Sequence, residues 1–217
     1  MSQLFIGTSG WSYKHWKNSF YAGVAKKNRL RHYAKHFSSV EVNATFYRLQ
    51  TPDTFKRWYE DTPDSFTFAV KGNHYLTHSK KLLDPINSVL IEKEHASPLG
   101  KKLVVILWQL PKTFKKDLHR LKSFLHALQP WDDVRHTLEF RHNSWFDDET
   151  ADCLTDSGIA VCISDSADWP LWKRVTTDLV YIRLHGHTHT YVSSYRSHEL
   201  AQWAEQIDHW LSENKKV

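Results

Sequence analysis

Two periods of hydrophobicity alternate along the chain. Short runs of five to eight residues, rich in β-branched and aromatic side chains, are bounded by polar residues, glycine or proline, and this pattern is typical of β-strands. Between them, apolar residues recur at every third or fourth position, which is typical of amphipathic helices. The short runs predict seven strands, over residues 4–8, 39–46, 66–71, 103–110, 137–142, 159–165 and 179–186.

The amphipathic segments predict helices over residues 28–37, 52–61, 116–128, 147–158 and 197–214. Strands that alternate with helices form parallel sheets with right-handed crossovers. Seven strands favour an α/β fold of the TIM (β/α) barrel type, in a single domain over 1–217, with an eighth strand apparently missing. A doubly wound open sheet is the alternative, but no G-x-G-x-x-G turn follows the first strand, as its nucleotide-binding form would require.

One face of the predicted strands ends in polar side chains. Successive side chains alternate between the two faces of a strand, and on one face the apolar or small residues give way to functional groups at the C-terminal end. In a barrel these ends converge on one pocket. The groups expected there are Glu41, Asn43, Lys71, Gln109, Glu139, Arg141, Asp165, Arg183 and His185.

Three carboxylates would balance one lysine and two arginines in this ring. Because unpaired buried charges are costly, near-neutral pairing suits a buried site, although ion pairs at a barrel mouth can also be purely structural. We favour a binding or catalytic pocket, since six successive strands end in this way. The expected catalytic residues are Glu41, Lys71, Glu139, Asp165 and His185.

The chemistry expected is acid–base catalysis on a phosphorylated or otherwise anionic substrate, by a hydrolase or an isomerase. Glu139 or Glu41 would act as base if its pKa were raised, with His185 as the acid. Lys71 would clamp a phosphate or carboxylate, and the nearby carboxylates should keep its pKa too high for a nucleophile. The residues expected to contact substrate are Thr8, Ser9, Trp11, Asn43, Gln109, Arg141, Arg183 and Tyr195.

Metal binding is the less favoured alternative at this pocket. Glu41, Glu139, Asp165 and His185 form a hard oxygen and nitrogen donor set that suits Mg, Mn or Zn, but three neighbouring cations oppose it. No cofactor is therefore predicted. His185, His187 and His189 are spaced by two, yet a chain with 15 histidines produces such runs by chance.

A basic surface suggests a second class of function. The net charge is +5, and segment 14–36 interleaves basic residues with Trp16, Phe20, Tyr21 and Tyr33, as nucleic-acid binding requires. A solvated surface is the simpler interpretation. No apolar run approaches the ~20 residues of a membrane span, no signal-peptide pattern is present, and two cysteines make no disulfide framework. These features predict a cytoplasmic protein without a membrane partner.

Several motifs occur in order along the chain: "IGTSGWSY", "VEVNATFYRL", "FTFAVKGNHYLTH", "LWQLP", "LEFRHNSWF", "CISD" and "VYIRLHG". Together they resemble the YecE-like family, domain of unknown function seventy-two, over essentially the whole chain. The resemblance implies a TIM-barrel fold and does not imply a reaction. It adds Tyr47 and Trp145 to the expected substrate-binding residues.

The chain departs from that family after its last predicted helix. Family members usually continue into an eighth strand with a Phe-Asn-Asn-Asp-like motif, where this sequence has "ENKKV". Without that strand the edges of the first and seventh strands would be unpaired, which favours self-association. The alternatives are an inactive truncated barrel, a partner that covers the gap, or a different closure.

Overall fold

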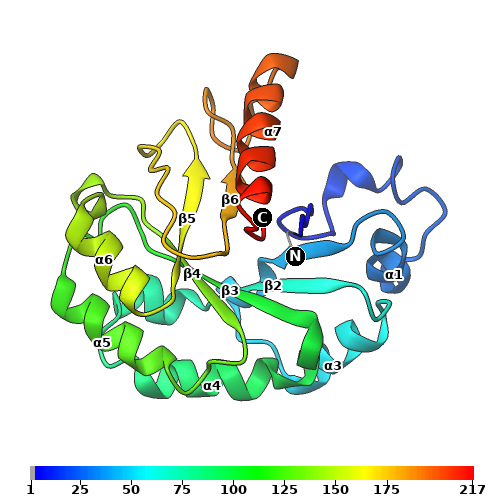
Figure 1. Ribbon diagram of the computed structural model, residues 1–217. Helices are drawn as coiled ribbons and strands as arrows, with labels where there is room; N and C mark the ends of the chain where they lie inside the picture. Colours follow the sequence, from blue (N-terminus) through cyan, green and yellow to red (C-terminus); the bar gives the residue numbers. More distant parts are fainter. Residues whose placement is uncertain (1–2) are drawn as a thin grey trace.

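The computed structural model describes residues 3–217 and contains a six-stranded parallel sheet in the order β1-β2-β3-β4-β5-β6. Figure 1 shows the sheet curled as a half-barrel, with α3, α4, α5 and α6 on its outer side. The strands are β1 Ser39–Val42, β2 Thr67–Lys71, β3 Leu103–Gln109, β4 Arg135–Glu139, β5 Ala160–Asp165 and β6 Tyr181–Leu184.

The helices begin where the sequence supplies caps. The side chains of Thr51, Asp117 and Asp147 accept hydrogen bonds from the first turns of α3, α5 and α6, and Gly158 adopts φ +67° after α6, as expected of a helix end. The helices are α1 Arg29–Tyr33, α2 Ala44–Tyr47, α3 Pro52–Glu60, α4 Ile86–Ala96, α5 Leu118–Leu128, α6 Asp148–Asp156 and α7 Ser197–Ser212. Shorter helical turns are η1 Lys14–Trp16, η2 Lys26–Asn28, η3 Tyr75–Ser79, η4 Ser97–Lys102 and η5 Asn143–Trp145.

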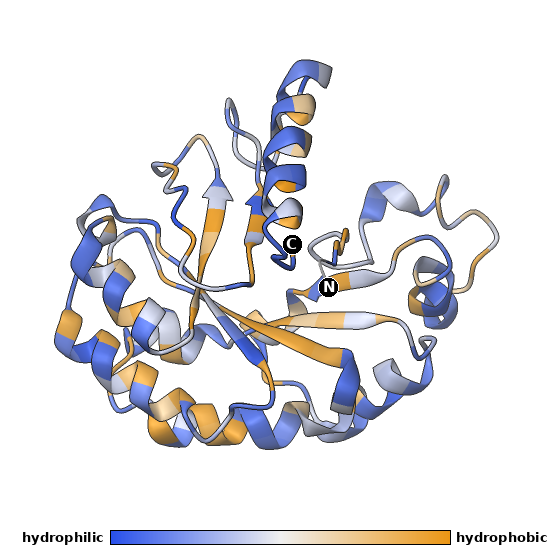
Figure 2. Cartoon of the chain, viewed as in Figure 1, coloured by the Kyte–Doolittle hydropathy of each residue, from blue (hydrophilic) through white to orange (hydrophobic). Residues whose placement is uncertain are grey.

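The main core lies between the sheet and its helices. Trp108 of β3 is fully buried, packs edge-on against Phe124 of α5 and approaches Gly72 so closely that a Cβ there would lie 2.3 Å from the indole. The hydropathy colouring places apolar residues along the strands and on the helices (Figure 2). The opposite, inner face packs only a small apolar group of Val105, Ala160 and Leu179, which leaves room for polar side chains.

The predicted strand over residues 4–8 does not form, so the expectation of seven strands is wrong for the described residues. Only isolated bridges mark this segment. Ser9 bridges Glu41 of β1, and Gln3 bridges Lys216. A regular strand needs continuous pairing, and the segment has too few partners along its length to complete one.

Residues 216 and 217 lie between the two edges of the sheet. Lys216 bridges both Gln3 and Leu179, which precedes β6. The Phe5 amide donates to the Val217 carbonyl at 2.7 Å, and the Val180 amide donates to the Lys216 carbonyl at 2.8 Å. The edges expected to be free are thus linked at the N-terminal ends of the strands, and self-association stays a prediction.

Candidate active site

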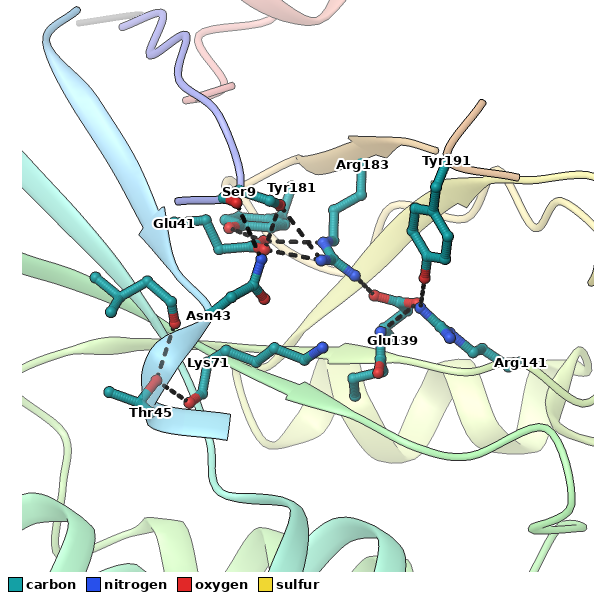
Figure 3. A network of polar contacts seen from close by, with 12 residues as sticks. Ser9, Glu41, Asn43, Thr45, Lys71, Glu139, Arg141, Tyr181, Arg183 and Tyr191 are labelled. Carbon is teal, nitrogen blue, oxygen red and sulfur yellow. Dashed lines mark hydrogen bonds and ion pairs between the residues drawn. The ribbon is translucent and has the colours of Figure 1, made fainter. Parts of the chain in front are cut away.

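Arg183 stands at the centre of a buried ion-pair network on the inner face. Its Nε and Nη2 donate to the two oxygens of Glu41 at 2.9 and 2.7 Å, and its Nη1 donates to Glu139. Figure 3 shows the guanidinium between the two carboxylates. The three side chains come from β6, β1 and β4 and are at most 7% exposed. The convergence predicted for these three strand ends is therefore present.

Both carboxylates also accept hydrogen bonds from other side chains. Glu41 accepts from Ser9 Oγ at 2.6 Å and from the Tyr181 hydroxyl at 2.9 Å. Glu139 accepts from Arg141 Nε at 2.5 Å and from Gln109 Nε2 at 3.1 Å. Every carboxylate oxygen in the network therefore has at least one donor, and buried charges of this kind are held in fixed geometry.

The network keeps both carboxylates ionised. Burial alone would raise the pKa of Glu41, but Arg183 and the hydrogen bonds from Ser9 and Tyr181 lower it below its usual value. Burial opposes ionisation of Glu139 too, and Arg183 and Arg141 outweigh it, so the pKa of that carboxyl is well below its usual value. The expectation that one of them is a base with a raised pKa is wrong, because both are paired with arginine.

Lys71 ends β2 beside this network without joining it. The side chain is 7% exposed, and its Nζ lies 3.9 Å from the centre of the Phe46 ring. Within residues 3–217, no hydrogen bond or ion pair reaches that Nζ, and Figure 3 shows the side chain pointing toward the network. The side chain is thus largely buried, and its amine, which keeps some contact with solvent, has no fixed acceptor in that part of the chain.

The pKa of Lys71 is lowered to about 8, first by burial and then by Arg183, while Glu139 and Glu41 act in the opposite direction. The expectation that the carboxylates keep this pKa high is wrong. Both carboxylates already neutralise arginines, and burial penalises the ammonium more than they stabilise it.

His185 follows β6 and is also buried. Burial and then Arg183 lower the pKa of its imidazole to about 4, so it is neutral at pH 7. Its Nε2 has no hydrogen-bond partner, and its ring packs edge-on against Trp169 and Tyr191. Arg141 lies 3.7 Å from the centre of the Trp169 ring. The expected protonated acid is therefore a neutral imidazole.

Asp165 does not belong to the inner face. In the β5–β6 register, Cys162 and Ser164 lie beside Tyr181 and Arg183, whereas Asp165 lies beside Leu184. Paired residues in a sheet point to the same side, so the predicted parity of β5 is off by one. The Asp165 carboxylate accepts from the Tyr195 hydroxyl at 3.1 Å instead. Two carboxylates therefore face three cations, and the site carries a net charge of +1 when Lys71 is protonated.

The remaining expected substrate-binding residues occupy four different places. Trp145 is fully buried in the core, where its indole donates to the Phe114 carbonyl at 2.8 Å, so it cannot contact a ligand. Tyr47 is 74% exposed. Tyr195 contacts Asp165 and the Gly186 amide. The others lie near Ser9 or along the N-terminal segment: Asn43 donates to the Ser9 carbonyl, Thr8 contacts Tyr33 and Trp11 packs against Trp58.

A metal ion does not fit these residues. The oxygens of Glu41 and Glu139 are bound by guanidinium groups, and Asp165 points to the other face. Within residues 3–217, no group of three or more His, Cys, Asp and Glu side chains is arranged to hold a metal, and this includes the run from His185 to His189.

Four aromatic residues at the site were not among the predicted site residues. Phe46 supports Lys71, Trp169 supports Arg141, and the hydroxyls of Tyr181 and Tyr191 bond to Glu41 and Arg141. Tyr181 shares the inner-face parity of Arg183, so alternation could have identified it. Trp169 and Tyr191 lie in loops, where no periodicity indicates direction.

The basic segment 14–36 differs from its expected form. Tyr21 and Tyr33 are 1% and 0% exposed, and Trp16 and Tyr33 pack against each other, so neither tyrosine can stack on a base. A hollow of about 340 Å³ lies on this segment and is lined in part by Arg31, His32 and Lys35. The charged part of this prediction keeps a structural basis, and of its four aromatic residues only Trp16 and Phe20 are partly exposed.

The family model described as "Protein of unknown function DUF72" matches residues 5–217. The chain belongs to the DUF72 family. This membership confirms the resemblance found in the ordered motifs, and it covers the segments that contribute Ser9, Glu41, Lys71, Glu139 and Arg183 to the site.

Relatives in this DUF72 family come from several bacteria. The chain is 32% identical to the UPF0759 protein YecE of Escherichia coli K12 over 144 residues, which are 66% of this chain and 50% of that protein. It is 29% identical to the UPF0759 protein YunF of Bacillus subtilis over 157 residues, 66% of this chain and 52% of that protein. The matched region thus spans about half the length of these curated relatives.

Solved structures of DUF72 proteins share the fold. A crystal structure from Thermotoga maritima superposes with a TM-score of 0.81 at 28% identity, covering 95% of this chain and 87% of that one. One from Enterococcus faecalis gives 0.78 at 20% identity, with 100% and 89% covered. The second similarity concerns the fold alone.

No helix within residues 3–217 is both long and apolar enough to cross a membrane.

Proposed function

We propose that this DUF72 protein is an enzyme that binds a small anionic substrate at the C-terminal ends of its strands and acts on it by proton transfer. The observation that carries the proposal is the amine of the largely buried Lys71, which has no acceptor among residues 3–217 although two arginine–glutamate pairs lie beside it. A buried cation without a partner is costly, and an anionic ligand would remove that cost.

The electrostatics support an anion rather than a cation as ligand. Glu41 and Glu139 are neutralised by Arg183 and Arg141, which leaves the charge of Lys71 uncompensated. Arg141 also keeps donors, because only its Nε is held by a carboxylate and its side chain is 13% exposed. A carboxylate or a singly charged phosphate between Lys71 and Arg141 would bring the site to neutrality.

Two groups could transfer protons. His185 is neutral and has a free buried Nε2, so it can accept a proton from a substrate. Lys71, with a pKa of about 8, can return one near neutral pH, and catalytic pKa values near the working pH are the most effective. A hydrolase or isomerase uses such a pair, whereas the paired glutamates only orient the cations.

The test is a thermal-shift screen of phosphorylated and carboxylated metabolites, with inorganic phosphate and glycolate as minimal probes. The wild type, Lys71→Met and Glu139→Gln are compared, with Lys101→Met as the control because Lys101 is an exposed lysine just before β3, at the opposite end of that strand. We expect ligands that raise the melting temperature of the wild type and the control but not of the two site variants. Equal responses of all four proteins would refute the site.

A second candidate function rests on the charges of segment 14–36. With Tyr21 and Tyr33 buried and Trp16 and Phe20 partly exposed, this surface would bind a nucleic acid mainly through phosphates, around the hollow lined by Arg31, His32 and Lys35. It therefore predicts binding that is independent of sequence and steeply weakened by salt. An electrophoretic shift at low salt, with Arg31→Glu/Lys35→Glu as the variant, tests it, and absence of any complex would remove it.

We also propose that the half-barrel is part of a (β/α) barrel that closes through residues 216 and 217. The bridges from Lys216 to Gln3 and Leu179 support this closure. It predicts slow hydrogen exchange at the amides of Phe5 and Val180, which donate to Val217 and Lys216. Exchange of both amides at the rate of an unstructured peptide would contradict the closure.

A further inference from the structure

We propose that Lys71 is a nucleophile that forms an imine with an aldehyde or ketone carrying an anionic group. This inference rests on the anion-binding function proposed above and assigns its substrate class. The amine ends β2 on the inner face, is 7% exposed, and lies on the Phe46 ring with no acceptor within residues 3–217. Hydrogen-bond acceptors would fix the position and the protons of an amine. The Lys71 amine has none in that range, so it is free to attack a carbonyl carbon.

The environment favours the reactive, uncharged amine. With a pKa of about 8 instead of 10.5, about one lysine in ten is neutral at pH 7, against about one in three thousand for an ordinary lysine. Burial and the neighbouring Arg183 cause this shift, and both are known means by which proteins activate a lysine. The gain in reactive amine is about 300-fold.

A second histidine contacts the same aromatic ring as the amine. His78 of η3 packs edge-on against the same Phe46 ring, with ring centres 4.9 Å apart, and burial followed by Lys71 lowers its pKa to about 4. Its Nδ1 lies 2.9 Å from the Thr77 hydroxyl, which itself donates to the Asn73 carbonyl at 3.4 Å. The proposed reaction uses the tautomer in which Nδ1 donates to Thr77 and Nε2 keeps its lone pair.

The reaction balances without an oxidant or reductant. The lone pair of Lys71 Nζ attacks the carbonyl carbon, a C–N bond forms, and the π electrons of the carbonyl move to oxygen, which takes a proton from solvent, so that the product is the protonated imine. The nitrogen loses a proton to His78 Nε2. Proton return to the hydroxyl then releases water as the nitrogen lone pair forms the C=N bond. One water leaves, and Arg141 would hold the anionic group of the substrate.

The experiment uses glyoxylate, the smallest aldehyde with a carboxylate, and sodium cyanoborohydride to trap the imine at pH 7. Peptide mass spectrometry locates the adduct. We expect Lys71 to react first, with a rate that rises with pH to a midpoint near 8, and His78→Gln to slow it about a hundredfold, the lower end of the range for proton-transfer catalysis. Lys71→Arg, which keeps the charge, and Lys71→Met should lose this adduct.

Buried Lys102 is the internal control, because its Nζ is already hydrogen-bonded to the Tyr59 and Thr62 carbonyls and should not react. Modification of exposed lysines at least as fast as Lys71, or a Lys71 midpoint near 10.5, would overturn the inference. Thermal shifts with glycolate, which lacks the aldehyde, separate the two proposals. Binding of glycolate without a Lys71 adduct from glyoxylate refutes the nucleophile alone, whereas failure of both glycolate and phosphate to bind refutes the anion site on which it rests.

Discussion

Two lysines are buried at opposite ends of the sheet, and only one of them is hydrogen-bonded. Lys102, 2% exposed, immediately precedes β3. Its Nζ donates to the Tyr59 and Thr62 carbonyls at 2.7 Å each and approaches Thr62 Oγ1 at 3.3 Å. Lys71, 7% exposed, ends β2 and has no such acceptor within residues 3–217.

The difference separates a structural from a functional end of the sheet. Lys102 satisfies carbonyls at the C-terminal end of α3, so its charge is used to join a helix to a strand. Lys71 leaves its protons unbound at the end of the strands where parallel α/β proteins carry their active sites. Burial alone therefore does not distinguish the two roles, whereas the presence of fixed acceptors does.

Arg183 lies at the same end of the sheet as Lys71 but is a fully paired buried cation, so the variant Arg183→Met extends the comparison between paired and unpaired cations. The change leaves Glu41 and Glu139 without their shared partner. We expect the free energy of unfolding to fall by about 3–5 kcal/mol, measured by urea denaturation. Arg135→Met, which breaks a pair with Asp178 that is half-exposed, should cost less than about 1 kcal/mol. Equal losses in both variants would contradict the importance of the buried network.

Lys102→Met should cost about 3 kcal/mol, because it removes two hydrogen bonds from a charged donor and leaves the Thr62 carbonyl without that donor, while the Tyr59 carbonyl keeps a longer hydrogen bond from Thr62 Oγ1 at 3.3 Å. Urea denaturation at pH 7 measures the loss, with the slope of the transition unchanged. Lys101→Met provides the control, since Lys101 is adjacent and exposed. A loss no larger than that of the control would show that the three contacts of Lys102 do not stabilise the fold.

The titration of Lys71 should make the free energy of unfolding depend on pH in the alkaline range. Its pKa is about 8 in the folded protein and about 10.5 when unfolded, so between these values the unfolded chain binds more protons. Stability contributed by this group therefore rises with pH from 8 to 10.5, by about 2–3 kcal/mol. The difference between wild type and Lys71→Met, followed by urea denaturation across this range, isolates it. A difference that is flat with pH would mean that the pKa of Lys71 is not lowered.

Lys71→Met should be the mildest change at pH 7 and opposite in sign to Lys102→Met. It replaces a buried amine that has no fixed acceptor by an apolar side chain of similar length, so we expect a gain of about 1–2 kcal/mol. Calorimetric melting of Lys71→Met and Lys102→Met at pH 7 checks the contrast. Destabilisation of both variants to the same extent would remove the distinction between the two lysines.

Strand alternation predicted the inner face well where one face of a strand differs from the other. In β4, Thr137 and Glu139 alternate with Leu138, and in β6, Tyr181 and Arg183 share a side, as expected. In β5, residues from Ala160 to Ser164 are all buried. Their sequence carries no sign of which side faces inward, so the parity of Asp165 could only come from pairing with β6.

Other features depend on distance rather than on order in the sequence. The number of charges can be read from the sequence, but the burial of Lys71 cannot. That burial is the main reason why the pKa of Lys71 is lowered. Trp145 was expected at the substrate, yet the Phe114 carbonyl satisfies its indole inside the core. The sequence does not distinguish a tryptophan whose indole is hydrogen-bonded in the core from a tryptophan that contacts a ligand.

The bridges of Lys216 to Gln3 and Leu179 also bear on how the protein is made. Lys216 leaves the ribosome more than 200 residues after Gln3, so the nascent protein must wait to join these segments. The strands that pack under α3, α4 and α5 need no such delay, because their contacts are between neighbours in the sequence. The bridges of Lys216 thus carry the largest loop-closure cost and form last. Until they form, residues 3–9 and β6 are exposed and can bind chaperones.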